Sequence, residues 1–481
     1  MNLKMMAYTL GRMLGVEAVV LLIPALVAGI YGESLTPFLF TSAILLIPFL
    51  VFGIKKPKNS TIYGKEGFVI IAIAWILWSA FGALPFCFSG EIPHYIDALF
   101  ETVSGFTTTG STILTDIEAM SYGMNFWRCL THWIGGMGVL VFVLALVSIE
   151  DKHSMHLMRA EVPGPEKDKL VPKAKDSARI LYLMYFVLTA AEVILLLCGG
   201  MNLYDSIIHS FSTAGTGGFS NQQISIGAYD SAYIDGVITT FMILFGINFN
   251  IFYLMILRKF KPALKNEEAR VYLGVIAVAT FAIMLNILHI YETPLKAFRY
   301  AIFQVAAMIT TTGFATADFN LWPHFSQCIL MAVMVIGACA GSTGGGMKVS
   351  RVLILLKSIK QEIRRVIHPK SVNVVKVNGK KVGEDTVRGA HIYLVVYVSI
   401  FVFATLLISL DASTNFPTTI SAVLTTMNNV GPGIDNVGPM GGFSDFSVFS
   451  KLVFCFNMLA GRLEIIPFLI LFSPSLWRKK F

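Results

Sequence analysis

Two short stretches of this chain share the run Thr-Thr-Thr-Gly. They are "SGFTTTGSTIL" at residues 104–114 and "MITTTGFATAD" at residues 308–318. Both lie between long apolar segments. They contain too much Thr and Gly to continue a helix, yet they carry too little charge for an ordinary surface loop. The same pattern recurs in two further connections of the chain.

Four connections align on one glycine each, namely Gly110, Gly218, Gly313 and Gly431. The intervals between them are 108, 95 and 118 residues. An aliphatic residue stands eleven positions before each glycine, and a small residue six positions before; these are Leu99, Ile207, Ile302 and Ile420, then Ser104, Ser212, Ala307 and Thr425. Such a pattern indicates an internal repeat. It predicts four units of span, half-helix, glycine loop and span, preceded by two further spans.

The composition places these units in a membrane. Of the 481 residues, 55% are hydrophobic and 14% are charged, whereas a typical soluble domain has about 25% charged residues. Apolar runs of about 18 to 25 residues recur, and each is long enough to cross a bilayer. We predict an all-α polytopic membrane protein with crossings near residues 11–32, 36–54, 67–88, 125–149, 178–199, 232–257, 271–290, 325–347, 389–410 and 446–474.

The distribution of charge predicts orientation rather than a nucleic-acid partner. The net charge is +8, and about 32 of the 37 Lys and Arg lie in residues 4–12, 55–65, 152–179, 258–270, 348–388 and 478–480. The connections between these regions are acidic. By the positive-inside rule, the basic connections and both termini are cytoplasmic. One basic connection contains "SVNVVKVNGKKV" at residues 371–382, which predicts a short β-hairpin with an Asn-Gly turn.

The repeat divides the chain into five segments. Residues 1–66 form an N-terminal two-helix unit, and residues 67–150 form the first pore unit. Residues 151–265 form the second unit with a preceding cytoplasmic loop. Residues 266–368 form the third unit with an intramembrane glycine loop, and residues 369–481 form the fourth unit with the cytoplasmic hairpin.

Four glycine loops at one depth can form a cation-selective filter. Arranged around one axis, their carbonyl oxygens would replace the water around a cation, and glycine permits the positive φ that this backbone requires. The half-helices would point their partially negative ends at the pore. The predicted filter residues are Thr108, Thr109, Gly110, Thr216, Gly217, Gly218, Thr311, Thr312, Gly313, Asn429, Val430 and Gly431. In the alternative interpretation, each glycine only caps a helix.

Two further features predict a gate below this filter. The segment "GACAGSTGGGMK" at residues 337–348 interrupts a predicted span and should be unwound; its alternative role is close helix packing. Arg462 lies about midway through the last predicted span, where an ionisable group faces a cavity. It could hold the carbonyls of the glycine loop or, alternatively, pair with Glu192. The predicted gate residues are Gly337, Gly341, Gly344, Gly345, Gly346 and Arg462.

The sequence shows no pattern typical of an enzyme. The six cysteines occur singly, which indicates small buried side chains rather than a metal site or a disulfide framework. Cys339 and His132 are isolated from any residue that would complete a nucleophile–base pair. We predict a transport protein with no organic cofactor.

The four loops, the glycine-rich break and Arg462 together resemble the Trk/Ktr/HKT superfamily of potassium transporters. The two additional N-terminal spans resemble its TrkH branch. The most specific segments are "THWIGGMGVLV" at 131–141, "ITTTGFAT" at 309–316 and "AGSTGGGMKVSR" at 340–351. The resemblance implies potassium uptake across the bacterial inner membrane, with K⁺ bound in the filter.

The resemblance also implies partners and a gating mechanism. It implies a homodimer in membrane lipid, with one pore in each subunit, gated by the loop from about Gly337 to Gly346 and by Arg462. A cytosolic ring of TrkA-type subunits would bind nucleotide and dock on the basic loops, especially 350–388. Gly110 favours potassium, because sodium-transporting HKT relatives carry serine there. A cation-coupled symporter with broken helices is the alternative, although four repeats in one orientation favour a channel-like pore.

Overall fold

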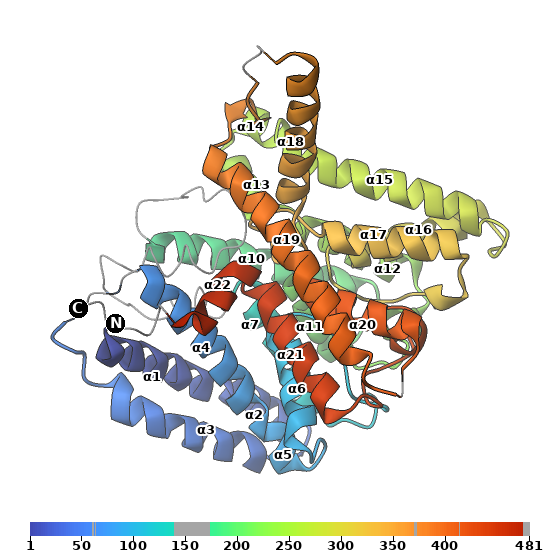
Figure 1. The fold of residues 1–481 in the computed structure, drawn as a ribbon. Coiled ribbons are helices and arrows are strands. Elements are labelled where there is room, and N and C mark those ends of the chain that lie inside the picture. The colour runs from blue at the N-terminus through green and yellow to red at the C-terminus, as the bar shows by residue number, and fades with distance from the viewer. Residues whose placement is uncertain (60–61, 63, 139–173, 370–372, 413, 475–481) are drawn as a thin grey trace.

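The computed structural model describes residues 1–481 except 60–61, 63, 139–173, 370–372, 413 and 475–481, and helices form almost all of its regular structure (Figure 1). The chain begins with α1 (Leu3–Val20), α2 (Leu22–Ile30) and α3 (Thr36–Pro48), which continues as a π-helical turn (Phe49–Gly53). Gly15 brings α1 close to this π-helical turn, since a Cβ added at Gly15 would lie 2.5 Å from the Phe49 ring.

Six helical segments in the described ranges are long and apolar enough to cross a membrane. Two are made by α1–α2 and by α3 with its π-helical turn; the others lie in α4 (Gly64–Gly82) with α5 (Leu84–Ser89), α10 (Ala174–Cys198), α15 (Glu267–Ile287) and α19 (Glu384–Ile408). Their outer faces expose large apolar side chains such as Val278 and Leu406. Such faces are stable against lipid and costly against water.

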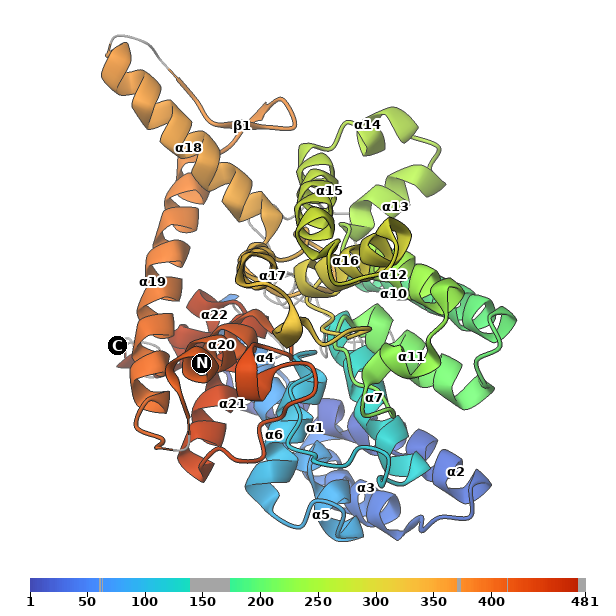
Figure 2. The same ribbon diagram turned by 90° about the vertical axis from the view of Figure 1, so that its right-hand side faces the viewer.

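Four shorter helices precede the aligned glycines, as the repeat predicted. They are α6 (Tyr95–Phe106), α11 (Leu203–Gly215), α16 (Pro294–Ile309) and α20 (Phe416–Asn428). Side chains cap three of them: Asn202, Thr293 and Asn415 each accept a hydrogen bond from an N–H of the first turn, which fixes where the helix begins. Figure 2 shows the four helices around the middle of the molecule.

Each aligned glycine is followed by a second helix, and these helices differ from the predicted continuous spans. They are α7 (Tyr122–Gly136), α12 (Ala232–Phe245), α17 (His324–Ile336) and α21 (Val448–Arg462). Residues 232–257 do not form one helix, because the chain bends by 92° between α12 and α13 (Phe249–Ile256). Residues 446–474 break after Arg462 into α22 (Ile465–Leu469) and a 3₁₀ turn (Ile470–Phe472). Most of the second half of the predicted span 125–149 lies outside the described residues.

The predicted hairpin is confirmed beside a helix that projects from the bundle. In β1 (Lys376–Val377) and β2 (Lys380–Lys381), Lys376 pairs with Lys381. The turn residues Asn378 and Gly379 both have positive φ, as the favoured two-residue hairpin turn requires. Figure 2 shows β1 beside α18 (Val349–Ile367), with α14 (Phe260–Leu264) at the same end of the molecule, away from the N-terminal helices.

The six cysteines are all free, but their burial corrects one prediction. Cys129, Cys339 and Cys455 are buried, Cys87 is half-buried, and Cys198 and Cys328 are exposed. The expectation of small buried side chains is therefore wrong for the last two, which lie on outward faces of apolar helices. Among the described residues, no group of three or more His, Cys, Asp or Glu is placed to hold a metal ion.

Candidate functional site: a ring of four glycine loops

The four aligned glycines lie in one closed ring of contacts. The Cα of each glycine faces the carbonyl oxygen of the residue that precedes the glycine of the next unit. A Cβ added at Gly110 would lie 1.9 Å from the Gly217 carbonyl oxygen, and one added at Gly218 would lie 2.1 Å from the Thr312 oxygen. A Cβ added at Gly313 would lie 1.9 Å from the Val430 oxygen, and one added at Gly431 would lie 2.8 Å from the Thr109 oxygen. The contacts run through the four units in order and return to the first.

The backbone of the four loops repeats its conformation. The φ angles of the glycines are 80°, 80°, 76° and 99° in chain order. The residues two positions earlier also have positive φ, at 55° for Thr108, 57° for Thr216, 59° for Thr311 and 55° for Asn429. This left-handed conformation is uncommon for residues other than glycine, and strained backbone of this kind concentrates at functional sites. Alternating left-handed residues point successive carbonyl groups the same way.

The side chains of the predicted filter residues are buried, and the four units use them differently. The hydroxyl of Thr109 lies 2.8 Å from that of Thr107, and Thr310 and Thr312 repeat this pair in the third unit. In the fourth unit the Asn429 amide donates to the Thr109 hydroxyl at 3.0 Å and to the Met458 carbonyl at 2.9 Å. The backbone ring is therefore close to fourfold, whereas the side chains that support it are not.

A polar buttress behind the ring supports the first two loops. Nine positions before the glycine, Glu101 accepts hydrogen bonds from the Thr112 hydroxyl at 2.9 Å and the Ile113 N–H at 3.0 Å. The equivalent His209 contacts the Ser220 hydroxyl at 2.9 Å. In the third unit the equivalent Gln304 is buried with no hydrogen-bond partner for its amide. The first two loops are thus tied to their half-helices by side chains at this position, and the fourth loop is tied by Ser421, which donates to the Ile434 carbonyl at 3.0 Å.

A buried arginine joins the first two loops to each other. Arg128 of α7 is 2% exposed. Its Nε lies 2.5 Å from the Glu101 carboxylate, and its Nη1 donates to the Ser220 carbonyl at 3.0 Å. The guanidinium lies 3.6 Å from the centre of the Phe219 ring. Sequence reasoning missed Glu101 and Arg128, although ionisable residues within apolar helices were the signal that could have found them.

A cavity is lined by the four glycines and by the residues that follow them. Its lining includes Arg128 and the segments that follow Gly110, Gly218, Gly313 and Gly431. The arrangement can exchange water for backbone oxygen around a small cation.

The glycine-rich segment predicted as a gate lies against the ring. Residues 337–348 leave α17 and reach α18 without forming a helix. The N–H of Gly345 donates to the Thr311 hydroxyl at 2.6 Å, and that of Gly346 to the Asn428 carbonyl at 3.1 Å. A Cβ added at Gly344 would lie 2.8 Å from the Thr310 oxygen. Gly337 packs against Gly345 and Gly346, whereas Gly341 lies away from the ring, since a Cβ added there would lie 3.2 Å from the Asn248 side chain.

Arg462 contacts both this segment and the C-terminal end of α7. Its Nη1 donates to the Thr343 carbonyl at 2.6 Å, and its Nη2 to the carbonyls of Gly135 and Gly136 at 2.7 and 2.6 Å. The prediction that Arg462 lies midway through a helical span is wrong, because α21 ends there. The alternative pair with Glu192 is also wrong, since both Glu192 carboxylate oxygens are buried without a hydrogen-bond partner.

Apolar helices long enough to span a membrane, packed around a closed ring of glycine loops, are typical of a helical membrane transport protein. Residues 38–479 match the family model described as "TrkH: Cation transport protein". The chain therefore belongs to the TrkH family of cation transport proteins, which confirms the resemblance seen in the sequence. It is a transporter and not an enzyme.

Individual relatives agree with this assignment over the whole chain. The "Trk system potassium uptake protein TrkH" of Escherichia coli strain K12 is 35% identical, with 95% of this chain and 96% of the relative covered. The TrkH protein of Vibrio parahaemolyticus is 34% identical over 99% of this chain and 100% of its own. The crystal structure of the potassium transporter TrkH from Vibrio parahaemolyticus matches with a TM-score of 0.90 at 32% identity, covering 99% of this chain and 100% of that chain.

Proposed function

We propose that this chain takes up potassium across the bacterial inner membrane as the membrane subunit of a Trk system. The main observation in its support is the closed ring of four glycine loops. The relatives are named as potassium uptake proteins, and this suggests potassium as the transported ion. In this proposal the twelve predicted filter residues form four pseudo-symmetric quadrants of a selectivity filter around one pore. K⁺ is the cargo and binds to their carbonyl oxygens, and no organic cofactor is needed. The division of the chain into five segments stays a prediction.

The filter is proposed to favour potassium over sodium. A dehydrated ion must regain from the protein the coordination that it loses from water, and a ring of backbone carbonyls suits the larger ion. Gly110 leaves the ring open at the position where serine would narrow it. The four loops carry different filter side chains and are supported by different contacts, so the side chains cannot surround the pore evenly and selectivity should be lower than that of a symmetric tetrameric channel.

The first test of this proposal is ion flux through the purified protein in liposomes. Gradients of K⁺, Rb⁺ and Na⁺ are compared, with and without an imposed proton gradient. We expect K⁺ and Rb⁺ to pass at least tenfold faster than Na⁺ without a second solute. Flux that occurs only with a proton or sodium gradient would contradict the channel-like pore and favour the cation-coupled symporter.

The intramembrane segment and Arg462 are proposed to form the gate. The segment lies across the base of two filter loops, and Arg462 ties it to the carbonyl end of α7, where a cation is favourable. Lys348, buried at the end of the segment, donates to the Gly344 carbonyl within it. Opening therefore requires the hydrogen bonds of Arg462 to the segment to break.

Replacing Arg462 by glutamine should increase K⁺ flux severalfold while leaving the K⁺/Na⁺ ratio unchanged. The neutral amide cannot bridge three carbonyl groups in two elements, so the segment loses its contact with α7. The measurement is tracer flux in liposomes. Arg270→Gln is the control, because Arg270 is an exposed arginine of α15 that donates to the Lys265 carbonyl at 3.3 Å. Unchanged or lower flux through folded Arg462→Gln protein would argue against the gate.

Partners are proposed for the surfaces that the bundle leaves exposed. The helix α18 exposes Leu356, Ile359, Ile363, Val366 and Ile367, and it carries basic residues in its last turn. An apolar and basic face of this kind suits a cytosolic TrkA-type subunit or the second subunit of a homodimer. Nucleotide would bind to the TrkA-type partner.

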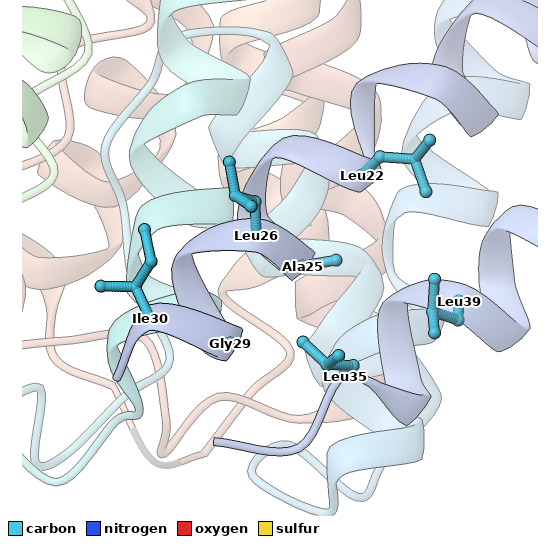
Figure 3. A pocket seen from close by; sticks show the side chains of 7 residues that line it. All are labelled: Leu22, Ala25, Leu26, Gly29, Ile30, Leu35 and Leu39. Atoms are coloured by element: carbon cyan, nitrogen blue, oxygen red, sulfur yellow. The ribbon is translucent and has the colours of Figure 1, made fainter. Parts of the chain in front are cut away.

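A groove on the N-terminal helices is proposed to bind membrane lipid. Figure 3 shows an apolar groove between α2 and the start of α3, which suits an acyl chain because it offers no polar side chain; its lining residues are Leu22, Ala25, Leu26, Gly29, Ile30, Leu35 and Leu39.

The contacts of Asn2 support the proposed orientation of the N-terminus. The Asn2 N–H donates to Glu66 at 2.7 Å and the Asn2 side chain to the Asn59 carbonyl at 2.8 Å. The N-terminus thus lies beside the basic connection 55–65, which supports a cytoplasmic N-terminus. The C-terminal tail, predicted to be cytoplasmic as well, lies outside the described residues.

A further inference from the structure

The carboxylate of Glu268 accepts hydrogen bonds from both ends of the intramembrane segment. Glu268 lies in the first turn of α15 and is 6% exposed. Its Oε1 accepts hydrogen bonds from the N–H of Ala340 at 2.6 Å and from the N–H of Ser350 at 3.1 Å. Ala340 stands near the beginning of the segment and Ser350 in the first turn of α18. A single oxygen atom therefore joins the two ends at the base of the loop.

The start of α18 depends on this carboxylate. The first N–H groups of a helix have no partner within the helix, and a side chain at the preceding position usually accepts from one of them. Here that position is Lys348, which gives no such cap and whose Nζ donates instead to the Gly344 carbonyl. Lys348 also has a φ of 77°. Glu268 supplies the acceptor and the negative charge that the helix start favours.

The remaining contacts of the segment lie along its length and at its tip. Its backbone pairs with the break between α12 and α13: the Cys339 N–H donates to the Gly246 carbonyl and the Phe249 N–H to the Gly341 carbonyl, both at 3.0 Å. Its tip contacts Thr311 of the filter. Glu268 contacts neither the filter loops nor the tip. The base of the loop can therefore be altered without changing a filter residue.

We propose that Glu268 is a positioning residue that staples the two ends of the intramembrane segment and keeps it across the base of the filter. This inference rests on the gate described under the proposed function. Without the carboxylate, the buried N–H of Ala340 and the half-buried N–H of Ser350 lose their acceptor, and such groups are costly unless they move to water or to another acceptor. A segment with five glycines gains much backbone entropy when it is released. Loss of the staple should therefore displace the segment.

Two variants and one matched control test the staple. Glu268→Ala removes the acceptor, and Glu268→Gln keeps an acceptor oxygen but removes the charge. The control is Glu267→Gln, because the neighbouring Glu267 carboxylate faces Lys357 at 2.5 Å and the Asn378 N–H at 3.2 Å, away from the segment. Cys339, 1% exposed and next to Ala340, serves as the reporter in protein whose other five cysteines are replaced by alanine.

The first readout is the rate at which a soluble maleimide modifies Cys339 in purified protein. The second is K⁺ and Na⁺ flux in liposomes without a partner. We expect at least tenfold faster modification and severalfold higher K⁺ flux in Glu268→Ala, with an unchanged K⁺/Na⁺ ratio. Glu268→Gln should show a smaller change because its amide oxygen still accepts. Glu267→Gln should show the same Cys339 modification rate and the same ion flux as the protein with both glutamates intact.

The outcomes separate the staple from the gate. Unchanged Cys339 modification in both Glu268 variants would overturn the staple, and so would equal acceleration in Glu267→Gln. Faster modification with unchanged flux would keep the staple and refute the gate of the proposed function. If Glu268→Ala does not fold, Glu268→Gln decides, because loss of the negative charge weakens both hydrogen bonds and should still accelerate modification.

Discussion

Substitution of Gly110 by serine is expected to reduce the K⁺/Na⁺ flux ratio at least tenfold, equivalent to about 1.4 kcal/mol of lost discrimination. A Cβ at this position would lie 1.9 Å from the Gly217 carbonyl oxygen of the neighbouring unit. Neither backbone can avoid the contact without moving a filter carbonyl. The φ of 80° adds strain for any residue with a side chain. The measurement is the ratio of K⁺ to Na⁺ tracer flux in liposomes.

A control separates backbone strain from the contact inside the ring. Gly90 has a φ of 79°, but an added Cβ there would meet no atom within 4 Å. Gly90→Ser thus introduces the same left-handed strain outside the ring, and we expect its flux ratio to be unchanged. A ratio that falls equally in both variants would mean that general strain rather than ring geometry causes the loss. An unchanged ratio in Gly110→Ser would exclude Gly110 from the filter.

Replacing Arg128 by methionine should cause the largest loss of stability. The substitution leaves the Glu101 carboxylate buried without its charged partner, and breaking a buried ion pair in this way costs about 3–5 kcal/mol. The first two filter loops also lose the side chain that joins them. We expect the thermal unfolding midpoint in detergent to fall by several degrees and the K⁺/Na⁺ ratio to fall with it.

The double variant Arg128→Met with Glu101→Gln tests the cause. Glutamine removes the unpaired charge and can still accept from Thr112 or Ile113, so we expect part of the stability to return. Lys296→Met is the surface control, because Lys296 and its partner Glu292 are both exposed and such pairs contribute little. A double variant no more stable than Arg128→Met would show that the loss comes from packing rather than from the buried charge.

The sequence by itself determined the class of protein, the four half-helices and the glycines of the ring. These features could be predicted because they are local or periodic. Apolar runs of bilayer length require helices, since lipid offers backbone groups no partner. A glycine at one place in each of four repeats marks a conformation that residues with side chains rarely adopt. The hairpin was predictable for the same reason, because Asn378 and Gly379 specify its turn.

The tertiary structure alone decided which distant groups meet. Nothing near Glu268 in the sequence indicates that it contacts Ala340 and Ser350, and nothing near Arg128 points to Ser220. The sequence left two partners open for Arg462, and the fold selected backbone carbonyls. The breaks after α12 and α21 were also missed, because apolar composition alone does not reveal where a helix bends. These contacts depend on how helices separated by many residues pack together, and such packing leaves no periodic signal in a single sequence.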